Sequence, residues 1–325
     1  MTRTQHKIRF LIAAAFLASV AAPVAAQTWP ARTVRIVVPY TPAGGVDTVA
    51  RLMAQRLSEQ TGATFVVENR PGAGGVIGTE LVARAAPDGY TLLMSASEFG
   101  INPAVRAKLP YDPLKDFTFI SQIALVQFIL AGHPSVPVRN VKELVAFAKA
   151  RPGQLTFGSA GAGSGPHFSG EMFQAATGIR WLHVPFKGAA PAATAVVSGE
   201  IGFLFSSTIT LMPHVRAGRL RAIAVTGARR YSELPELPTF AESGLPGYEP
   251  PLFYGYYAPA ATSPELVRRI HAEAARALNT PDVKEKLSRT GNDYIATTPE
   301  EFEKYLRANI PIWTKTAKQA DIRVD

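Results

Sequence analysis

The sequence predicts an α/β protein with two α/β domains and a ligand cleft between them. Short apolar runs alternate with amphipathic stretches along the chain, as in sheets that are covered by helices. The 325 residues exceed the length of one ordinary domain. Two glycine-rich turns, at residues 37–47 and 157–167, each follow an apolar run and open onto a helical pattern. Ligands of open α/β sheets bind beyond the carboxyl ends of strands, so two such turns indicate a site between the domains.

The elements of the first half follow from apolar periodicity. Apolar runs predict strands at 35–39, 65–67, 90–94 and 119–124. The spacing of apolar residues from Val46 to Leu57 predicts a helix, and the glycine turn at 72–75 leads into a second helix through Leu81. The alternation of the two element types favours a largely parallel sheet.

The second half repeats this alternation and ends in helices. Apolar runs predict strands at 126–131, 155–158, 201–205 and 220–225. Helical patterns cover 141–150, 189–198, 264–278, 281–290 and 299–317, and a buried stripe from Phe168 to Ala176 follows the second glycine turn. A proline near the start of each of the last three helices is typical of the first helical turn.

The N-terminal segment has the pattern of a secretory signal peptide. Arg3, Lys7 and Arg9 precede an apolar run at 10–22, and small residues at 24–26 then offer a cleavage site. The apolar run is too short to span a bilayer comfortably, which disfavours the alternative of a membrane anchor. We expect residues 1–26 to be removed and the mature, soluble chain to be periplasmic.

Composition excludes several kinds of site. The chain has no cysteine, which rules out disulfides, thiolate catalysis and cysteine-bound metals, and its six histidines lack metal-ligand spacing. The formal charge of +9 comes from scattered basic residues, without the aromatic interleaving of a nucleic-acid surface. We therefore expect no metal, no cofactor and no nucleic-acid partner, and a monomer whose core is large enough to fold without disulfides.

The two glycine turns are candidate anion sites. The first N–H groups of a helix lack partners inside the helix and carry partial positive charge, and glycine lets a ligand approach the backbone closely. We call residues 41–45 the first cradle and residues 159–164 the second cradle. Two cradles that face each other suit a small carboxylate or phosphate.

The candidate ligand-binding residues lie in the cradles and at nearby strand ends. They are Tyr40, Thr41, Pro42, Ala43, Gly44, Gly45, Asp47, Ser95, Ser97, Ser159, Ala160, Gly161, Gly163, Ser164, His167, Lys187, Ser206 and Phe253. Several also have a purely structural interpretation. Asp47 fits the positive end of a helix dipole as well as a ligand role through water, and His167 suits a local hydrogen bond. Lys187 fits a solvated lysine, and Phe253 fits either an apolar wall or the core.

Enzyme motifs fit the sequence poorly. Residues 161–165 read Gly-Ala-Gly-Ser-Gly with proline next, which does not match a nucleophile elbow, and the sequence places no partner acid or histidine. Neither glycine turn ends in the Gly-Lys-Ser/Thr of a phosphate-binding loop, and residues 72–78 lack the spacing of a dinucleotide fingerprint. We expect no catalytic residues, and an exported serine hydrolase is the alternative from a different class.

Five motifs carry a family resemblance. The run at 38–47 reads Val-Pro-Tyr-Thr-Pro-Ala-Gly-Gly-Val-Asp, and the run at 67–75 reads Val-Glu-Asn-Arg-Pro-Gly-Ala-Gly-Gly. Further runs are Ala-Pro-Asp-Gly-Tyr-Thr-Leu at 86–92, His-Val-Pro-Phe-Lys-Gly at 183–188 and Leu-Pro-Thr-Phe-Ala-Glu at 237–242. Together they resemble the substrate-binding proteins of tripartite tricarboxylate transporters, also called the Bug family. The resemblance covers essentially the whole mature chain in the right order.

This resemblance implies a fold and a function. The fold is of the periplasmic-binding-protein type II kind, with domain 1 formed by residues 27–126 and 250–325 and domain 2 by residues 127–249. The implied function is capture of a small carboxylate by the two cradles and its delivery to the permease subunits of a tripartite tricarboxylate-type transporter. A ligand sensor for a signalling partner is an alternative of the same binding class.

The chain departs from the family pattern at the end of one predicted strand. The family often has aspartate there, whereas this chain has Ser206 and Ser207, and Gly202 replaces another frequent aspartate. Phe253 and Tyr254 stand near the position of a frequent tryptophan. The serines make an amino-acid ligand less expected. Dicarboxylates, citrate-like acids and aromatic carboxylates remain open.

Overall fold

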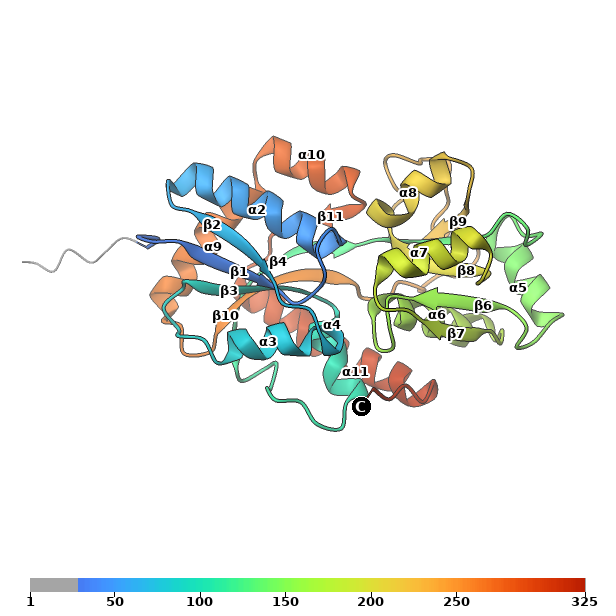
Figure 1. Cartoon of the computed structure of the whole chain (residues 1–325), viewed down its shortest axis with the longest axis horizontal. Coiled ribbons are helices and arrows are strands. Elements are labelled where there is room, and N and C mark those ends of the chain that lie inside the picture. Colours follow the sequence, from blue (N-terminus) through green and yellow to red (C-terminus); the bar gives the residue numbers. More distant parts are fainter. Residues whose placement is uncertain (1–28, 325) are drawn as a thin grey trace, which may run out of the picture.

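The computed structural model describes residues 29–324 and contains two β-sheets side by side (Figure 1). The six-stranded sheet has the order β11-β4-β10-β3-β1-β2. Its strands are β1 (Val34–Val38), β2 (Phe65–Asn69), β3 (Thr91–Ala96), β4 (Phe117–Val126), β10 (Phe253–Pro259) and β11 (Asn292–Tyr294). We call this sheet and its helices the first lobe. The predicted signal peptide lies outside the described residues.

The five-stranded sheet has the order β7-β6-β8-β5-β9 and forms the second lobe with its helices. Its strands are β5 (Phe128–Gly132), β6 (Thr156–Ser159), β7 (Leu182–Pro185), β8 (Phe203–Ser207) and β9 (Arg221–Val225). None of the helices within residues 29–324 combines the length and apolarity needed to cross a membrane. The division of the chain between the two sheets supports the proposed domain bounds, which stay a prediction.

Strand direction differs from the sequence prediction. β1 pairs in parallel with β2 and β3, and β6 with β7 and β8. β10 is antiparallel to β3 and β4, β11 to β4, and β5 to β8 and β9. The expectation of a largely parallel sheet is therefore wrong. Apolar periodicity does not report direction, and β4 runs out towards the second lobe whereas β10 returns from it.

Helices cover both faces of the first sheet. On one face lie α2 (Gly45–Thr61), α9 (Pro264–Leu278) and α10 (Pro281–Arg289). On the other lie α3 (Val76–Ala83), α4 (Glu98–Val105) and α11 (Pro299–Gln319), with the short helix η1 (Ala73–Gly75) before α3. Strand β1 shows why both faces are apolar: Ile36 and Val38 pack under α2, and Val37 points to the opposite cluster.

The second sheet is covered in the same way. The helices α5 (Val141–Lys149) and α6 (Gly165–Thr177) enclose an aromatic cluster that includes Phe157, Phe173 and Trp181 on one face. The helices α7 (Ala189–Ser198) and α8 (Thr208–Arg216) cover the other face. The loop that carries Phe240 and Tyr248 closes the aromatic cluster. Each sheet thus has its own two cores.

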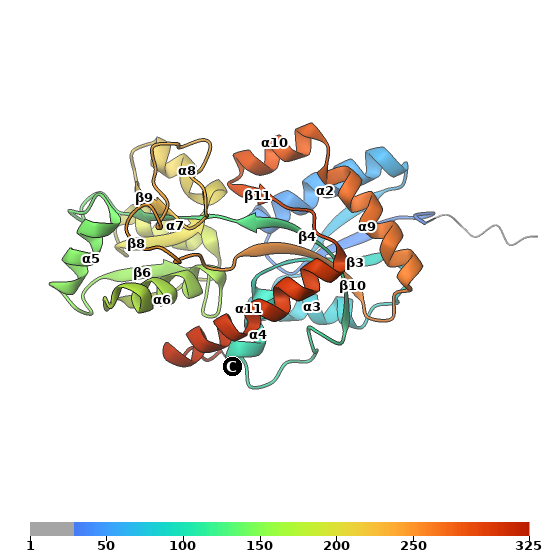
Figure 2. The same ribbon diagram turned by 180° about the vertical axis from the view of Figure 1, so that it is seen from behind.

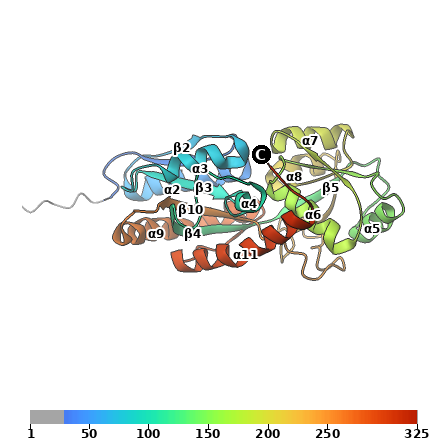
Figure 3. The ribbon, with the colours of Figure 1, turned by 90° about the horizontal axis from the view of Figure 1, so that it is seen from below.

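Two chain crossings and one helix connect the lobes. The chain leaves the first lobe from β4 through Gln127 into β5 and returns through Leu252 into β10. Figures 2 and 3 show α11 running from the first lobe to the side of α6. Phe168 of α6 belongs to a core cluster of the first lobe, and the Val324 N–H donates to the Val105 carbonyl at 2.9 Å.

Polar contacts join the lobes beside α10. The Gln127 N–H donates to the Gly291 carbonyl at 3.1 Å. The Tyr231 hydroxyl donates to the Arg289 carbonyl at 2.5 Å, and the Thr208 hydroxyl donates to the Thr290 carbonyl. The end of α10 is therefore held by both the crossing strand and the second lobe.

Most predicted elements match the structure within a few residues, and six elements were not predicted, one of them the short helix η1 in the expected glycine turn. The helices α4 and α8 contain Pro103 and Pro213, which interrupt a helical pattern. The short strands β7 and β11 have four and three residues. The strand β10 is buried at all seven positions, so it shows no alternation.

Gly100→Ala is expected to destabilise the first lobe. A Cβ at Gly100 would collide with the Trp313 ring and lie 2.8 Å from a Leu306 methyl. Overpacking of this kind costs about 1–3 kcal/mol. The measurement is the free energy of unfolding from urea denaturation. Gly202→Ala is the matched control, since its new Cβ would meet nothing closer than 3.4 Å. Equal stability of both variants would contradict the packing of α4 on α11.

Candidate functional site

Both cradles lie at the carboxyl ends of strands, where each strand turns into a helix. The first follows β1 and leads into α2, and the second follows β6 and leads into α6. The first intrahelical bond of α2 runs from the Thr48 N–H to the Gly44 carbonyl at 3.0 Å, and no side chain caps this end of the helix. The N–H groups of the first turn, at Gly45 and Val46, therefore have no partner within α2.

Asp47 holds the first cradle in shape. Its Oδ2 accepts from the Ala43 N–H and from Arg51 Nε, each at 2.9 Å, and its Oδ1 accepts from the Asn69 side-chain amide at 2.9 Å. Burial raises the pKa of the Asp47 carboxyl, but these hydrogen bonds outweigh burial and leave the pKa below its ordinary value. Because Asp47 is only 2% exposed and all its contacts are internal, the structural interpretation is favoured over a ligand contact.

Most polar backbone groups of the second cradle form hydrogen bonds within the cradle or with its neighbouring side chains. The Gly161 N–H donates to Ser159 Oγ at 3.1 Å, and the Ser164 N–H and hydroxyl both donate to the Gly161 carbonyl. The Gly163 N–H donates to His167 Nδ1 at 3.1 Å, which is the local hydrogen bond that the sequence allowed for His167. Fewer donors are left for a ligand here than in the first cradle.

A stacked histidine pair supports the second cradle. The rings of His167 and His183 lie 3.6 Å apart at an interplanar angle of 10°. His183 Nε2 lies 2.6 Å from the Ser159 hydroxyl. Burial, and then the proximity of His167, lowers the pKa of His183 to about 3, so its ring is neutral at physiological pH. Ser159 is fully buried and also bonds the cradle backbone, so this serine–histidine contact serves structure.

The first cradle faces the second lobe. An ideal Cβ at Gly188, in the loop before α7, would lie 4.0 Å from the Thr41 hydroxyl. A Cβ at Gly45 would lie 3.9 Å from Ser207 Cβ and would collide with the Tyr254 hydroxyl. We call the space bounded by the first cradle, Gly188, Ser207 and Tyr254 the interlobe site. Glycine at position 45 is needed because Tyr254 occupies the place of a side chain.

A chain of hydrogen bonds links the two lobes across this site. The Tyr40 hydroxyl lies 3.1 Å from Ser95 Oγ and donates to Glu98 Oε2 at 3.3 Å. Glu98 Oε1 accepts from the Gly165 N–H, at the first position of α6, at 2.9 Å. Sequence reasoning missed Glu98, and it considered Tyr254 only as part of an apolar wall or of the core. The signal for Glu98 was available, because it directly follows the strand that carries Ser95 and Ser97.

Other candidate residues lie apart from the interlobe site or make no contact that assigns them to it. Ser97 is buried and its hydroxyl accepts from the Phe253 N–H at 2.9 Å. The Phe253 side chain is fully buried against Phe302 in the first lobe, which favours the core over an apolar cleft wall, the two alternatives that the sequence left open. Ser206 is 2% exposed, and Lys187 is exposed. Pro42, in contrast, belongs to the first cradle and is exposed, and the Ala160 carbonyl accepts from the N–H of Gly188, which bounds the interlobe site, at 3.2 Å.

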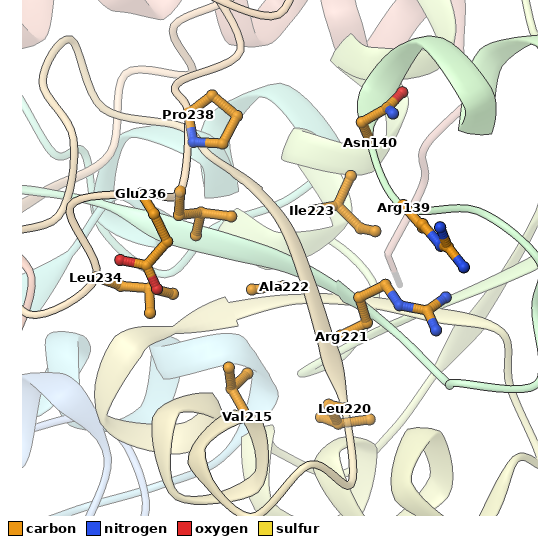
Figure 4. Close-up of a pocket in the computed structure, with 11 residues that line it drawn as sticks. Arg139, Asn140, Val215, Leu220, Arg221, Ala222, Ile223, Leu234, Glu236 and Pro238 are labelled. Atoms are coloured by element: carbon orange, nitrogen blue, oxygen red, sulfur yellow. The ribbon is translucent and has the colours of Figure 1, made fainter.

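Two hollows lie away from the cradles. One hollow of about 400 Å³ has a lining that includes Arg139, Arg221, Glu236 and Pro238 (Figure 4). It lies at the start of β9, at the end of the second sheet opposite the second cradle. Another of about 370 Å³ lies where Gln127 and α10 meet the second lobe. Neither contains a predicted site residue. Within residues 29–324 no group of three or more acidic or histidine side chains has metal-binding geometry.

Comparison with known proteins gives one consistent result. The family model of the tripartite tricarboxylate transporter family receptor matches residues 49–321. The protein BugT of Bordetella pertussis is 32% identical over 326 aligned residues, which cover 100% of this chain and 99% of BugT.

Solved structures extend the likeness to the fold. R. palustris Rpa4515 with adipate has a TM-score of 0.85 and 36% identity, and the match covers 91% of this chain and 99% of that one. The periplasmic binding protein BugD has a TM-score of 0.82 and 32% identity, with 91% and 99% covered. The prediction of a two-lobed α/β binding-protein fold is confirmed.

Asp47→Asn is expected to destabilise the protein at neutral pH. The change keeps the size of the side chain but removes a buried charge that accepts three hydrogen bonds, which costs about 1.5–3 kcal/mol. Since the folded-state pKa of Asp47 is lowered, its stabilisation is present above the unfolded pKa and is lost as pH falls through the folded pKa. Denaturation at neutral and at acid pH measures this difference.

Asp88→Asn is the matched control for Asp47→Asn. Asp88 pairs with Arg32 at 2.8 Å, but both side chains are well exposed, and such pairs contribute little. A stability difference for Asp47→Asn that stays constant from neutral to acid pH would contradict the role of its carboxylate.

Proposed function

Because this chain belongs to the tripartite tricarboxylate transporter receptor family, we propose that it binds a small carboxylate between its lobes and delivers it to a membrane permease. Members of this family are receptors rather than enzymes. Rpa4515, at 36% identity, has been solved with adipate, and BugD is a periplasmic binding protein. We extend both properties to this chain: a carboxylate ligand and a periplasmic location, as a monomer.

The carboxylate is proposed to bind the first cradle. The observation that carries this proposal is the uncapped start of α2, whose N–H groups at Gly45 and Val46 lack partners in the helix and belong to a turn that approaches the second lobe at Gly188 and Ser207. Backbone donors held by a rigid turn lose no side-chain entropy when an anion binds, and the helix dipole favours the negative charge. Asp47 contributes by fixing the turn.

Ligand capture is proposed to use the two chain crossings as hinges. Within residues 29–324, only the segments near Gln127 and Leu252 pass between the sheets, so a rotation of one lobe changes few backbone dihedral angles. Closure brings Gly188 and Ser207 over the first cradle and excludes water from the carboxylate. The permease then recognises the closed arrangement of the two lobes.

Thermal shift of residues 27–325 against carboxylates and amino acids tests this function. The protein is refolded first to remove carried-over ligand. A ligand at about 100 times its Kd adds about 2.7 kcal/mol, which raises the Tm by several degrees. A shift with at least one carboxylate, including a carboxylate that also carries an amino group, supports the proposal. A shift with no compound overturns it.

Gly44→Val is expected to weaken carboxylate binding at least about tenfold, a loss of about 1.4 kcal/mol, with little change in Tm. Gly44 has φ −78° and ψ 171°, which valine adopts, and its Cβ would meet only the Thr41 carbonyl at 3.7 Å. The branched side chain would then cover the free N–H groups. Gly163 is a poorer test because its φ of 76° strains any other residue.

The control for Gly44→Val is Gln55→Val, further along α2 on its exposed side, where the side chain bonds only Glu59 of the same helix. It adds the same side chain to the same helix without covering the cradle. Titration calorimetry with the best carboxylate of the panel compares the two. Equal affinities of Gly44→Val and the control would refute the first cradle as the anion site.

A further inference from the structure

Glu98 places a carboxylate of the protein itself at the interlobe site. Its Oε1 accepts from the Gly165 N–H of the second lobe, and its Oε2 accepts from the Tyr40 hydroxyl of the first lobe. The start of α6, the second positive helix end at this site, is therefore already occupied by an anion. An ionised carboxylate accepts about four hydrogen bonds, so Glu98 keeps capacity for a further donor.

The charge of Glu98 is not balanced by a cation. No lysine or arginine within residues 29–324 forms a salt bridge with it, and its hydrogen-bond donors are neutral. Partial burial raises the pKa of the Glu98 carboxyl, as expected for a poorly solvated carboxylate without a cationic partner. Its negative charge also contributes, after burial, to the raised pKa of Tyr254, whose hydroxyl lies over Gly45 of the first cradle. Tyr254 pairs with Ala96 in the antiparallel register of β10 and β3, two residues before Glu98, so Glu98 follows the strand position that faces Tyr254.

The two helix ends at the site are therefore unequal. The start of α2 offers free backbone donors, whereas the start of α6 offers an acceptor, the Glu98 carboxylate, in their place. A ligand with carboxylates at both ends would bring its second charge towards Glu98, and like charges that share a poorly solvated site repel strongly. A ligand with a donor at that end would fill the remaining acceptor capacity of Glu98 instead.

We propose that Glu98 is the specificity-determining residue of this receptor and selects monocarboxylates that carry a hydroxyl or ammonium donor at the opposite end. The inference rests on the proposed function and narrows its ligand class. It also revises the expectation drawn from Ser206 and Ser207. These serines leave the end of β8 without an acid, but Glu98 supplies one from the other lobe.

The test compares ligands of equal length. Calorimetry at neutral pH measures Kd for straight-chain dicarboxylates of four to six carbons and for the ω-hydroxy and ω-amino monocarboxylates of the same lengths. Wild-type protein is expected to bind the donor-bearing member of at least one length about tenfold or more tighter than the dicarboxylate. Glu98→Gln, which preserves the shape and the acceptor for Gly165, is expected to reduce this ratio at least about tenfold.

Two further variants keep the test decisive. Glu98→Asp retains the negative charge and is therefore expected to retain the preference for donor-bearing ligands. Comparing the Tm of Glu98→Gln and Glu98→Asp shows whether a loss of this preference comes from misfolding instead. Glu80→Gln removes the same charge from an exposed pair with Arg84 in the first lobe, and it should leave the ratio unchanged.

The outcomes separate the two proposals. Wild-type protein that binds dicarboxylates most tightly leaves the carboxylate receptor intact and overturns the role of Glu98. A donor preference that persists in Glu98→Gln also overturns it. Wild-type protein that binds no probe of any length overturns the carboxylate function together with the selectivity that rests on it.

Discussion

The main-chain N–H groups at the beginnings of α2 and α6 need hydrogen-bond acceptors, and the arrangement of the site depends on how these acceptors are supplied. A helix cannot satisfy the first of its own donors, and a buried donor without a partner is costly. The protein answers differently at the two ends. Around α6 it supplies acceptors from Ser159, His167 and Glu98, whereas α2 has no capping side chain and its loop is held from behind by Asp47. The N–H donors around the start of α6 therefore bond acceptors of the protein, whereas those at the start of α2 are left for a ligand.

The same contacts join the lobes. Glu98 reaches from the first lobe to the start of α6, and Phe168 of α6 packs among side chains of the first lobe. On the other side of the molecule, the Tyr231 hydroxyl and the Gln127 N–H hold the end of α10. A movement of the lobes must therefore exchange directed hydrogen bonds as well as apolar contacts, and directed bonds favour a few discrete arrangements over a continuum.

Sequence patterns predicted the features that depend on neighbouring residues, such as the starts of helices. The helices α9 and α11 begin with proline after a serine or threonine cap, and both were expected where they lie. The strand–glycine–helix turns were likewise readable from the sequence. Strand direction was not, because it depends on how the chain passes between the lobes. Nor was the contact of Glu98 with Gly165, because 67 residues separate the partners and nothing near Glu98 indicates which helix it will meet. Phe253 shows the same limit, since Phe302 and Trp313, the rings that enclose it, lie far along the chain.

The open start of α2 consists of main-chain atoms, which every amino acid carries. Point mutation of the gene therefore cannot delete these donors, short of introducing proline, as long as the turn keeps its shape. The side chains around them can change, at a small structural cost where the side chain is partly exposed, as at Ser207, and at a larger cost where it is buried or bonds the other lobe, as at Tyr254 and Glu98. The backbone groups that bind the carboxylate and the side chains that choose between ligands can therefore change independently in evolution. A receptor built in this way can acquire a new cargo by a handful of substitutions without passing through an ancestor that binds nothing.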